Sequence, residues 1–140
     1  MIFVGIDPGV ETGVAIWDSE KQEFKSIKSR NIIEAMADVR LLTVTYRNIK
    51  LIIEDARQRT WFGTIKGTKE DRNKAQGVGS VKRDCKIWEE FCEFNKLDYE
   101  LKHPKTNRTK LKAPDFKKIT GWQKQTNEHG RDAAMLVFKR

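Results

Sequence analysis

Apolar residues gather in short runs over the first part of the chain. Residues 1–6 are nearly all apolar, which is typical of a central strand covered on both faces. Further apolar runs at 13–17 and 23–28 are separated by a polar turn at 18–22. The pattern predicts three strands joined as a meander.

Helical and strand patterns then alternate to the end of the chain. Asn31 and Glu34 have capping-box spacing, so we expect a helix from there to about Tyr46. Residues 50–54 and 98–102 predict strands, and residues 73–95, 114–119 and 126–138 predict helices. This order predicts an α/β fold with a five-stranded mixed sheet flanked by helices.

The long helix at 73–95 carries two apolar stripes. One consists of Val78, Val81, Cys85, Trp88 and Cys92, and the other, about 130° away, of Ile87, Phe91 and Phe94. A surface helix needs one apolar stripe. The second indicates a partner subunit or an enclosed helix. Since the two cysteines fit no metal or disulfide pattern, we expect reduced core or interface residues.

Length and hydropathy narrow the class of protein. The chain has 140 residues, so we expect a single domain over 1–140. No run approaches membrane-spanning length and the N-terminus lacks a signal-peptide pattern. These features predict a soluble intracellular protein with no membrane partner.

The positive charge is confined to the middle of the chain. Residues 1–56 hold 7 Lys/Arg against 9 Asp/Glu, residues 57–124 hold 18 against 9, and residues 125–140 hold 3 against 2. The contributions to the net charge of +8 are therefore −2, +9 and +1. Such a segment favours a polyanion partner, although a solvated basic surface is the alternative.

Two carboxylates follow buried-looking strands. Asp7 comes directly after the first strand, at a turn formed by Pro8, Gly9 and Gly13, and Glu54 ends the strand at 50–54. If these strands are neighbours, the two acids meet and a cation would relieve their repulsion. Asp55 is expected on the other face. For Asp7 alone, a turn-favouring role in a hairpin is about equally plausible.

A third acidic group opens the last helix. His129 and Asp132 are three positions apart and so share a helix face. An acid near a helix N-terminus commonly compensates the helix dipole, so this signal is weak alone. With Asp7 and Glu54 it indicates a site for a hard cation such as Mg²⁺ or Mn²⁺. Two such ions can catalyse phosphodiester hydrolysis.

Three motifs in this order resemble the RuvC family of Holliday-junction resolvases, within the RNase H-like superfamily. They are GIDPGVETGVAIWD at 5–18, LIIED at 51–55 and HGRDAAMLV at 129–137. The resemblance implies one RNase H-like nuclease domain in which Asp7, Glu54, His129 and Asp132 hold two metal ions. It also implies a homodimer that nicks two opposed strands of a four-way DNA junction, leaving 5′-phosphate and 3′-hydroxyl ends.

The same resemblance implies which residues contact DNA and which form the dimer interface. Trp61 or Phe62 would stack on an unpaired base at the crossover. Basic residues in two stretches would contact phosphates, namely Arg57, Arg59, Lys66, Lys69, Lys102, Lys105, Arg108, Lys110 and Lys112. The stripe of Val78, Val81, Cys85, Trp88 and Cys92 would form the dimer interface. No small-molecule cofactor is implied, and the location would be bacterial or phage-infected host cytoplasm.

Other functions fit parts of the same pattern. The chain is shorter than typical bacterial members of the family, so a related nuclease acting on forks, flaps or RNA/DNA hybrids is one alternative. Another is a non-catalytic junction-binding protein. An actin-like or sugar-kinase-like phosphotransferase would match the turn at 7–13, but 140 residues leave no room for its second domain.

Overall fold

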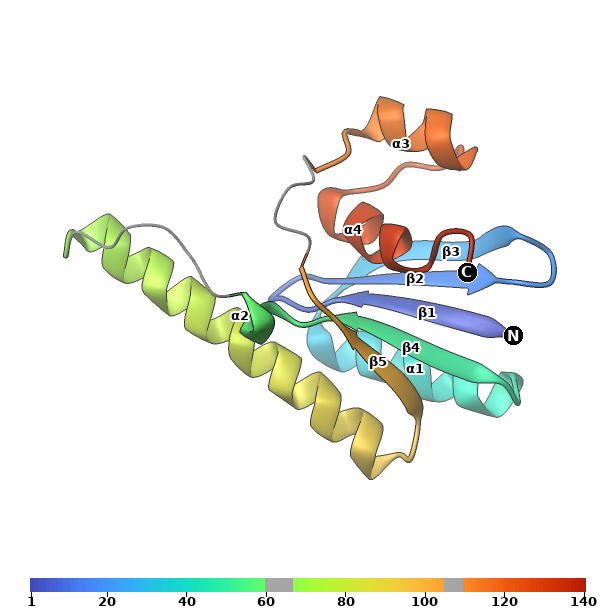
Figure 1. Cartoon of the computed structure of the whole chain (residues 1–140), viewed down its shortest axis with the longest axis horizontal. Helices are drawn as coiled ribbons and strands as arrows, with labels where there is room; N and C mark the ends of the chain where they lie inside the picture. The colour runs from blue at the N-terminus through green and yellow to red at the C-terminus, as the bar shows by residue number, and fades with distance from the viewer. Residues whose placement is uncertain (60–66, 105–109) are drawn as a thin grey trace.

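The computed structural model describes residues 1–59, 67–104 and 110–140, which form a five-stranded sheet with helices on both faces (Figure 1). The elements in chain order are β1 (Ile2–Asp7), β2 (Thr12–Asp18), β3 (Glu23–Arg30), α1 (Ile32–Thr45), β4 (Ile49–Glu54), the 3-10 turn η1 (Ala56–Gln58), α2 (Lys69–Phe94), β5 (Asp98–Lys102), α3 (Ala113–Thr120) and α4 (Glu128–Val137). The predicted α/β class and mixed sheet are confirmed.

The strand order β3-β2-β1-β4-β5 combines two kinds of pairing. Strands β1, β2 and β3 form the predicted antiparallel meander, whereas β4 lies parallel to β1 and β5 parallel to β4. Helices α1 and α2 supply the crossovers that parallel strands need. As a result β1, β3, β4 and β5 all finish at one end of the sheet, which we call its carboxyl end.

Both faces of the sheet are buried. Val4 and Ile53 belong to a core cluster with residues of α1 and α2, such as Trp88. On the other face, Ile52 packs with residues of α3 and α4, such as Ala133. Two covered faces explain why residues 1–6 and 51–53 are continuous apolar runs and do not alternate with polar residues.

Helix α2 begins four residues earlier than predicted and extends past the sheet. Thr68 and Asp71 form a capping box, in which the Thr68 hydroxyl accepts from the Asp71 amide at 3.1 Å. The N-terminal half of α2 projects away from the body of the protein (Figure 1), and most of its residues are exposed. No described helix is both long and apolar enough to cross a membrane.

Most of the predicted dimer stripe lies in the protein's own core, so that part of the prediction is wrong. Cys85, Trp88 and Cys92 are fully buried and cannot contact a partner. Burial raises the pKa of the Cys85 thiol to about 11 and that of Cys92 to about 12, which keeps both protonated. Val78 and Val81 are partly exposed, and their role at an interface stays a prediction.

Candidate active site

The carboxyl end of the sheet brings the first two predicted acids together. Asp7 is the last residue of β1 and Glu54 the last of β4. Because these strands are parallel neighbours with Ile6 opposite Ile53, the two carboxylates follow at the same level. The two strands are neighbours, which is the condition under which these acids meet.

Two glycines bring α4 unusually close to the sheet. A Cβ at Gly5 would overlap the carbonyl oxygen of Ala133, and a Cβ at Gly13 would overlap that of His129. Helix backbone therefore rests directly on β1 and β2, which places the first turn of α4 beside Asp7. The sequence predicts a turn role for Gly13, whereas its close contact is with α4.

The N-terminus of α4 is fixed by hydrogen bonds to its cap. Asn127 caps the helix by accepting from the Gly130 amide at 2.9 Å, and its own amide donates to Glu11 at 3.3 Å. Glu11 lies in the turn after Asp7 and also accepts from Ser29 at 3.3 Å. The turn after β1 and the start of α4 are thus tied together.

His129 and Asp132 both reach the carboxyl end of the sheet, as their spacing predicts. His129 Nδ1 lies 3.2 Å from Asp7 Oδ2. Asp132 lies close enough to Asp7 and Glu54 to disfavour the charged form of each. Three chain segments, at residues 7, 54 and 129–132, therefore meet in one site.

The surroundings of the acidic side chains in this site disfavour their charged forms. Burial, followed by the charge of Glu54, raises the pKa of Asp7 to about 7, and a contact with His129 only partly offsets this. Burial and the charge of Asp132 also raise the pKa of Glu54. Partly buried carboxylates that destabilise one another in this way are stabilised by a cation.

Lys110 supplies positive charge at the edge of the site. Its Nζ lies 3.3 Å from Asp132 Oδ2 and 3.5 Å from Glu128 Oε2. The segment carrying Lys110 is held by Arg131, which donates to the Leu111 carbonyl at 2.8 Å. This role of Arg131 could not be predicted from sequence, because its shortest hydrogen bonds go to the backbone carbonyls of Leu111 and Thr126, which leave no sequence signal.

The donor set suits a hard divalent cation. Three carboxylates and one imidazole match the oxygen-rich ligands that Mg²⁺ and Mn²⁺ prefer. Among the described residues, no three His, Cys, Asp or Glu side chains are close enough together to hold a metal ion in this conformation. Asp7 is instead paired with His129 and Asp132 with Lys110. The residues fit a metal chemically, and binding requires these side chains to converge.

A cleft of about 290 Å³ adjoins these acids. Glu54 and Asp132 are among its lining residues, together with basic and apolar side chains. The basic residues are Arg59, Lys102, Lys110 and Arg140, and the apolar ones are Pro104, Leu111, Met135 and Leu136. The cleft therefore offers positive charge to an anion lying beside the acidic residues.

The predicted phosphate contacts have different surroundings. Lys69 and Lys112 are exposed, and Lys102 pairs with Glu100 at 3.7 Å. Arg59 and Lys110 line the cleft. Five predicted DNA contacts lie outside the described residues: Trp61, Phe62, Lys66, Lys105 and Arg108.

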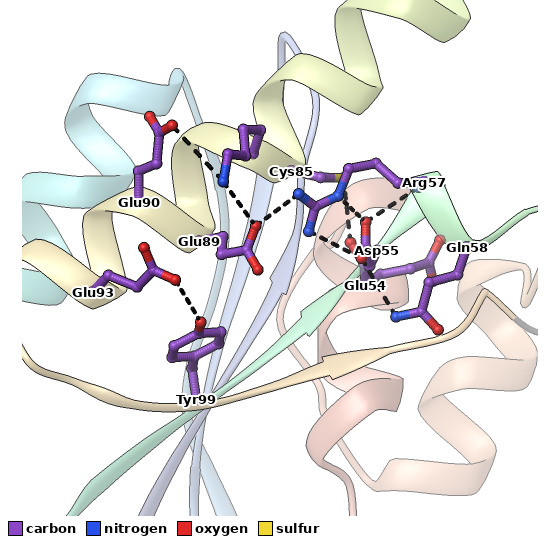
Figure 2. Close-up of polar contacts among 10 residues, drawn as sticks. Glu54, Asp55, Arg57, Gln58, Cys85, Glu89, Glu90, Glu93 and Tyr99 are labelled. Atoms are coloured by element: carbon purple, nitrogen blue, oxygen red, sulfur yellow. Dashed lines mark hydrogen bonds and ion pairs between the residues drawn. The ribbon is translucent and has the colours of Figure 1, made fainter.

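Arg57 has a structural role, and its assignment as a DNA contact stays a prediction. Figure 2 shows its guanidinium between Asp55 and Glu89, with Nε 2.7 Å from Asp55 and Nη1 2.7 Å from Glu89. Since Asp55 directly follows Glu54, this ion-pair chain joins α2 to the end of β4. A second link is the Cys85 thiol, which donates to the Glu54 carbonyl at 3.6 Å.

Comparison with known proteins agrees with this arrangement at the level of fold. No protein-family model matches the chain, and no curated protein matches it. Among solved structures, the chain is similar to T. thermophilus RuvC in complex with a Holliday junction substrate, with a TM-score of 0.59 and 16% identity. The match covers 99% of this chain and 92% of the other. The chain therefore has the RNase H-like fold of RuvC.

Proposed function

We propose that this protein is a metal-dependent DNA endonuclease that resolves four-way junctions. The observation that carries the proposal is the meeting of Asp7, Glu54 and Asp132 beside a basic cleft, in a fold shared with a protein solved on a Holliday junction. The homodimer, the two ions per site, the paired nicks, the single nuclease domain and the cytoplasmic location stay predictions.

The residues divide into metal-holding and DNA-holding groups. Asp7, Glu54 and Asp132, with His129, would hold the ions, which when bound supply an activated water and charge neutralisation for phosphodiester hydrolysis. Arg59 and Lys110 lie where a phosphate in the cleft would be bound by charge. Burial of Asp7 between β1 and α4 limits the water that competes with ligands at its carboxylate.

Cleavage of defined DNA structures tests the proposal. A labelled immobile four-way junction is compared with duplex, fork, flap and RNA/DNA hybrid, in Mg²⁺ or in EDTA. We expect paired, symmetric nicks in the junction only with the metal. Metal-dependent cutting of forks, flaps or hybrids alone would support the acidic site but contradict the four-way junction as its substrate. Absence of cutting from every substrate would contradict the nuclease proposal.

Substitution of Asp7 tests the site itself. Asp7→Asn keeps the size of the side chain but removes the charge that a metal needs, so cleavage should fall by at least about 100-fold. Junction binding, measured by fluorescence anisotropy in EDTA, should be unchanged or tighter because a negative charge is lost. Continued cutting by this variant would refute the site assignment.

A further inference from the structure

Lys110 pairs with one of the carboxylates that would hold a metal ion. Its Nζ lies 3.3 Å from Asp132 Oδ2 and 3.5 Å from Glu128 Oε2. Because Glu128 and Asp132 are four positions apart on α4, their carboxylates lie on one face of the helix and share this ammonium group. Lys110 therefore neutralises part of the acidic site.

The backbone next to Lys110 is fixed to α4, which keeps the ammonium group near the helix. Arg131 donates through Nε to the Leu111 carbonyl at 2.8 Å and through Nη1 to the Thr126 carbonyl at 2.8 Å. A tethered group has a high effective concentration at the site that it can reach. Lys110 can change partners among the carboxylates of α4, but it stays within their reach.

Glu128 also lies beside the imidazole of the site. Its Oε1 is 3.7 Å from His129 Nε2, while His129 Nδ1 is 3.2 Å from Asp7 Oδ2. The side chain of Glu128 is 54% exposed, whereas that of Asp132 is 24% exposed. Glu128 is therefore the more solvated acid beside both Lys110 and His129.

A metal ion at Asp132 and the ammonium group of Lys110 compete for one carboxylate, because two cations at close range repel each other. We propose that Lys110 occupies the acidic site of the metal-free protein as a built-in cation, and that metal entry transfers it from Asp132 to Glu128. Glu128 is then a positioning residue, which holds Lys110 after the exchange without contacting the metal. The inference rests on the proposed function, because the metal site is part of that proposal.

The exchange makes the site respond to the charge of the incoming ion. A monovalent ion offers Asp132 no more charge than Lys110 does, and Lys110 has the advantage of its tether. A divalent ion offers twice the charge and also gains the carboxylate oxygens of Asp7 and Glu54 as ligands. The side chains of the site can therefore stay paired until Mg²⁺ or Mn²⁺ replaces Lys110.

Mn²⁺ binding to the DNA-free protein tests the inference without a cleavage assay. Electron paramagnetic resonance measures free Mn²⁺ during a titration and gives the dissociation constant. Lys110→Met keeps an unbranched side chain and removes the competing charge, so it should tighten Mn²⁺ binding by about threefold to tenfold.

Lys102→Met is the matched control for this substitution. Lys102 also lines the cleft, but its ammonium group pairs with Glu100 at 3.7 Å. Loss of its charge should change the Mn²⁺ dissociation constant by less than about twofold. Equal dissociation constants for the native protein and Lys110→Met would overturn the inference.

Glu128→Gln tests the carboxylate that receives Lys110. Without this carboxylate the displaced ammonium group loses its new partner, so Mn²⁺ binding should weaken by about threefold. In a Lys110→Met background the same substitution should have a much smaller effect, because no ammonium group has to be received. The double-mutant cycle measures this coupling directly. An effect of equal size in both backgrounds would make Glu128 a ligand or a distant charge, and would overturn its role in the exchange.

Failure of the inference can be distinguished from failure of the proposed function. Unchanged Mn²⁺ affinity in Lys110→Met, with intact junction cutting by the native protein, would refute the exchange alone. The expected affinity changes without junction cutting would support the exchange and refute the nuclease proposal. Absence of Mn²⁺ binding from the native protein and every variant would overturn both.

Discussion

Gly13 controls the site through its lack of a side chain. Gly13→Ala should push α4 away from β2, because the added methyl would overlap the His129 carbonyl oxygen. Overpacking of this kind costs about 1–3 kcal/mol or more in unfolding free energy, and cleavage should be lost with the displaced His129 and Asp132. Urea unfolding and junction cleavage measure the two effects.

Gly79 provides the control for this substitution. It lies in α2 with open space where a Cβ would go, so Gly79→Ala should raise stability by about 0.5–1 kcal/mol. If Gly13→Ala were as harmless as Gly79→Ala, the close approach of α4 would not hold in solution.

Asp55 should make stability depend on acid pH. Burial would raise its pKa, but hydrogen bonds from Arg57 and Gln58 outweigh burial and hold the pKa below its ordinary value. Because this pKa is lower in the native protein than the value of ~3.9 in the unfolded chain, the charged Asp55 stabilises the fold at pH values above ~3.9. This stabilisation is lost as the pH falls below that value. Asp55→Asn should therefore cost about 2–3 kcal/mol at pH ~7 and much less at pH ~3.

Urea unfolding at the two pH values checks this prediction. Asp98→Asn is the control, since Asp98 is largely exposed and pairs with Lys50 only at 3.7 Å. An Asp55→Asn penalty that is equal at both pH values would show that the carboxylate charge is not the cause.

At the scale of elements, the segment after β4 carries two arginines that have different roles. Arg57 is held between Asp55 and Glu89, while Arg59 lines the cleft. Arg57→Ala should lower the unfolding free energy by about 1–3 kcal/mol and leave the salt dependence of junction binding unchanged. Arg59→Ala should weaken binding and reduce the salt slope by about one. The reverse result in anisotropy titrations would restore Arg57 as a DNA contact.

The elements were predictable because the local signals agreed with the fold. Asn31 caps α1 as its spacing indicates, accepting from the Glu34 amide at 2.9 Å, and every predicted strand is present within about two residues of its expected bounds. Thr68 and Asp71 also cap α2, but the predicted start at 73 overlooked them because the charged residues that follow hid the helical pattern.

The site was predictable in part, for a physical reason. Strand-end carboxylates such as Asp7 and Glu54 are visible in sequence because apolar runs precede them. The burial of Cys85 and Trp88 could not be predicted. Periodicity identifies an apolar face of a helix, but it does not say whether a sheet or a second subunit covers that face. Nor could sequence show that Arg57 belongs to an ion-pair chain, since Glu89 lies 32 residues away.

For the whole molecule, the distribution of charge should govern the proposed binding to DNA. Residues 57–124 carry 18 Lys/Arg against 9 Asp/Glu, and Arg59, Lys102 and Lys110 from this segment line the cleft. Junction affinity should fall by at least about tenfold between ~50 and ~200 mM salt, as phosphate contacts release counterions. Anisotropy over a salt series measures this, and affinity that is insensitive to salt would contradict a basic binding surface.

The order of the acidic residues along the chain also has a consequence during protein synthesis. Asp7 and Glu54 lie in the first part of the chain, but α4 packs on β1 and β2 with the last part. A ribosome makes the sheet strands first and α4 last. The acidic cluster therefore cannot be complete on a nascent chain until residues 129–132 have left the exit tunnel, so an unfinished polypeptide would lack the proposed nuclease site.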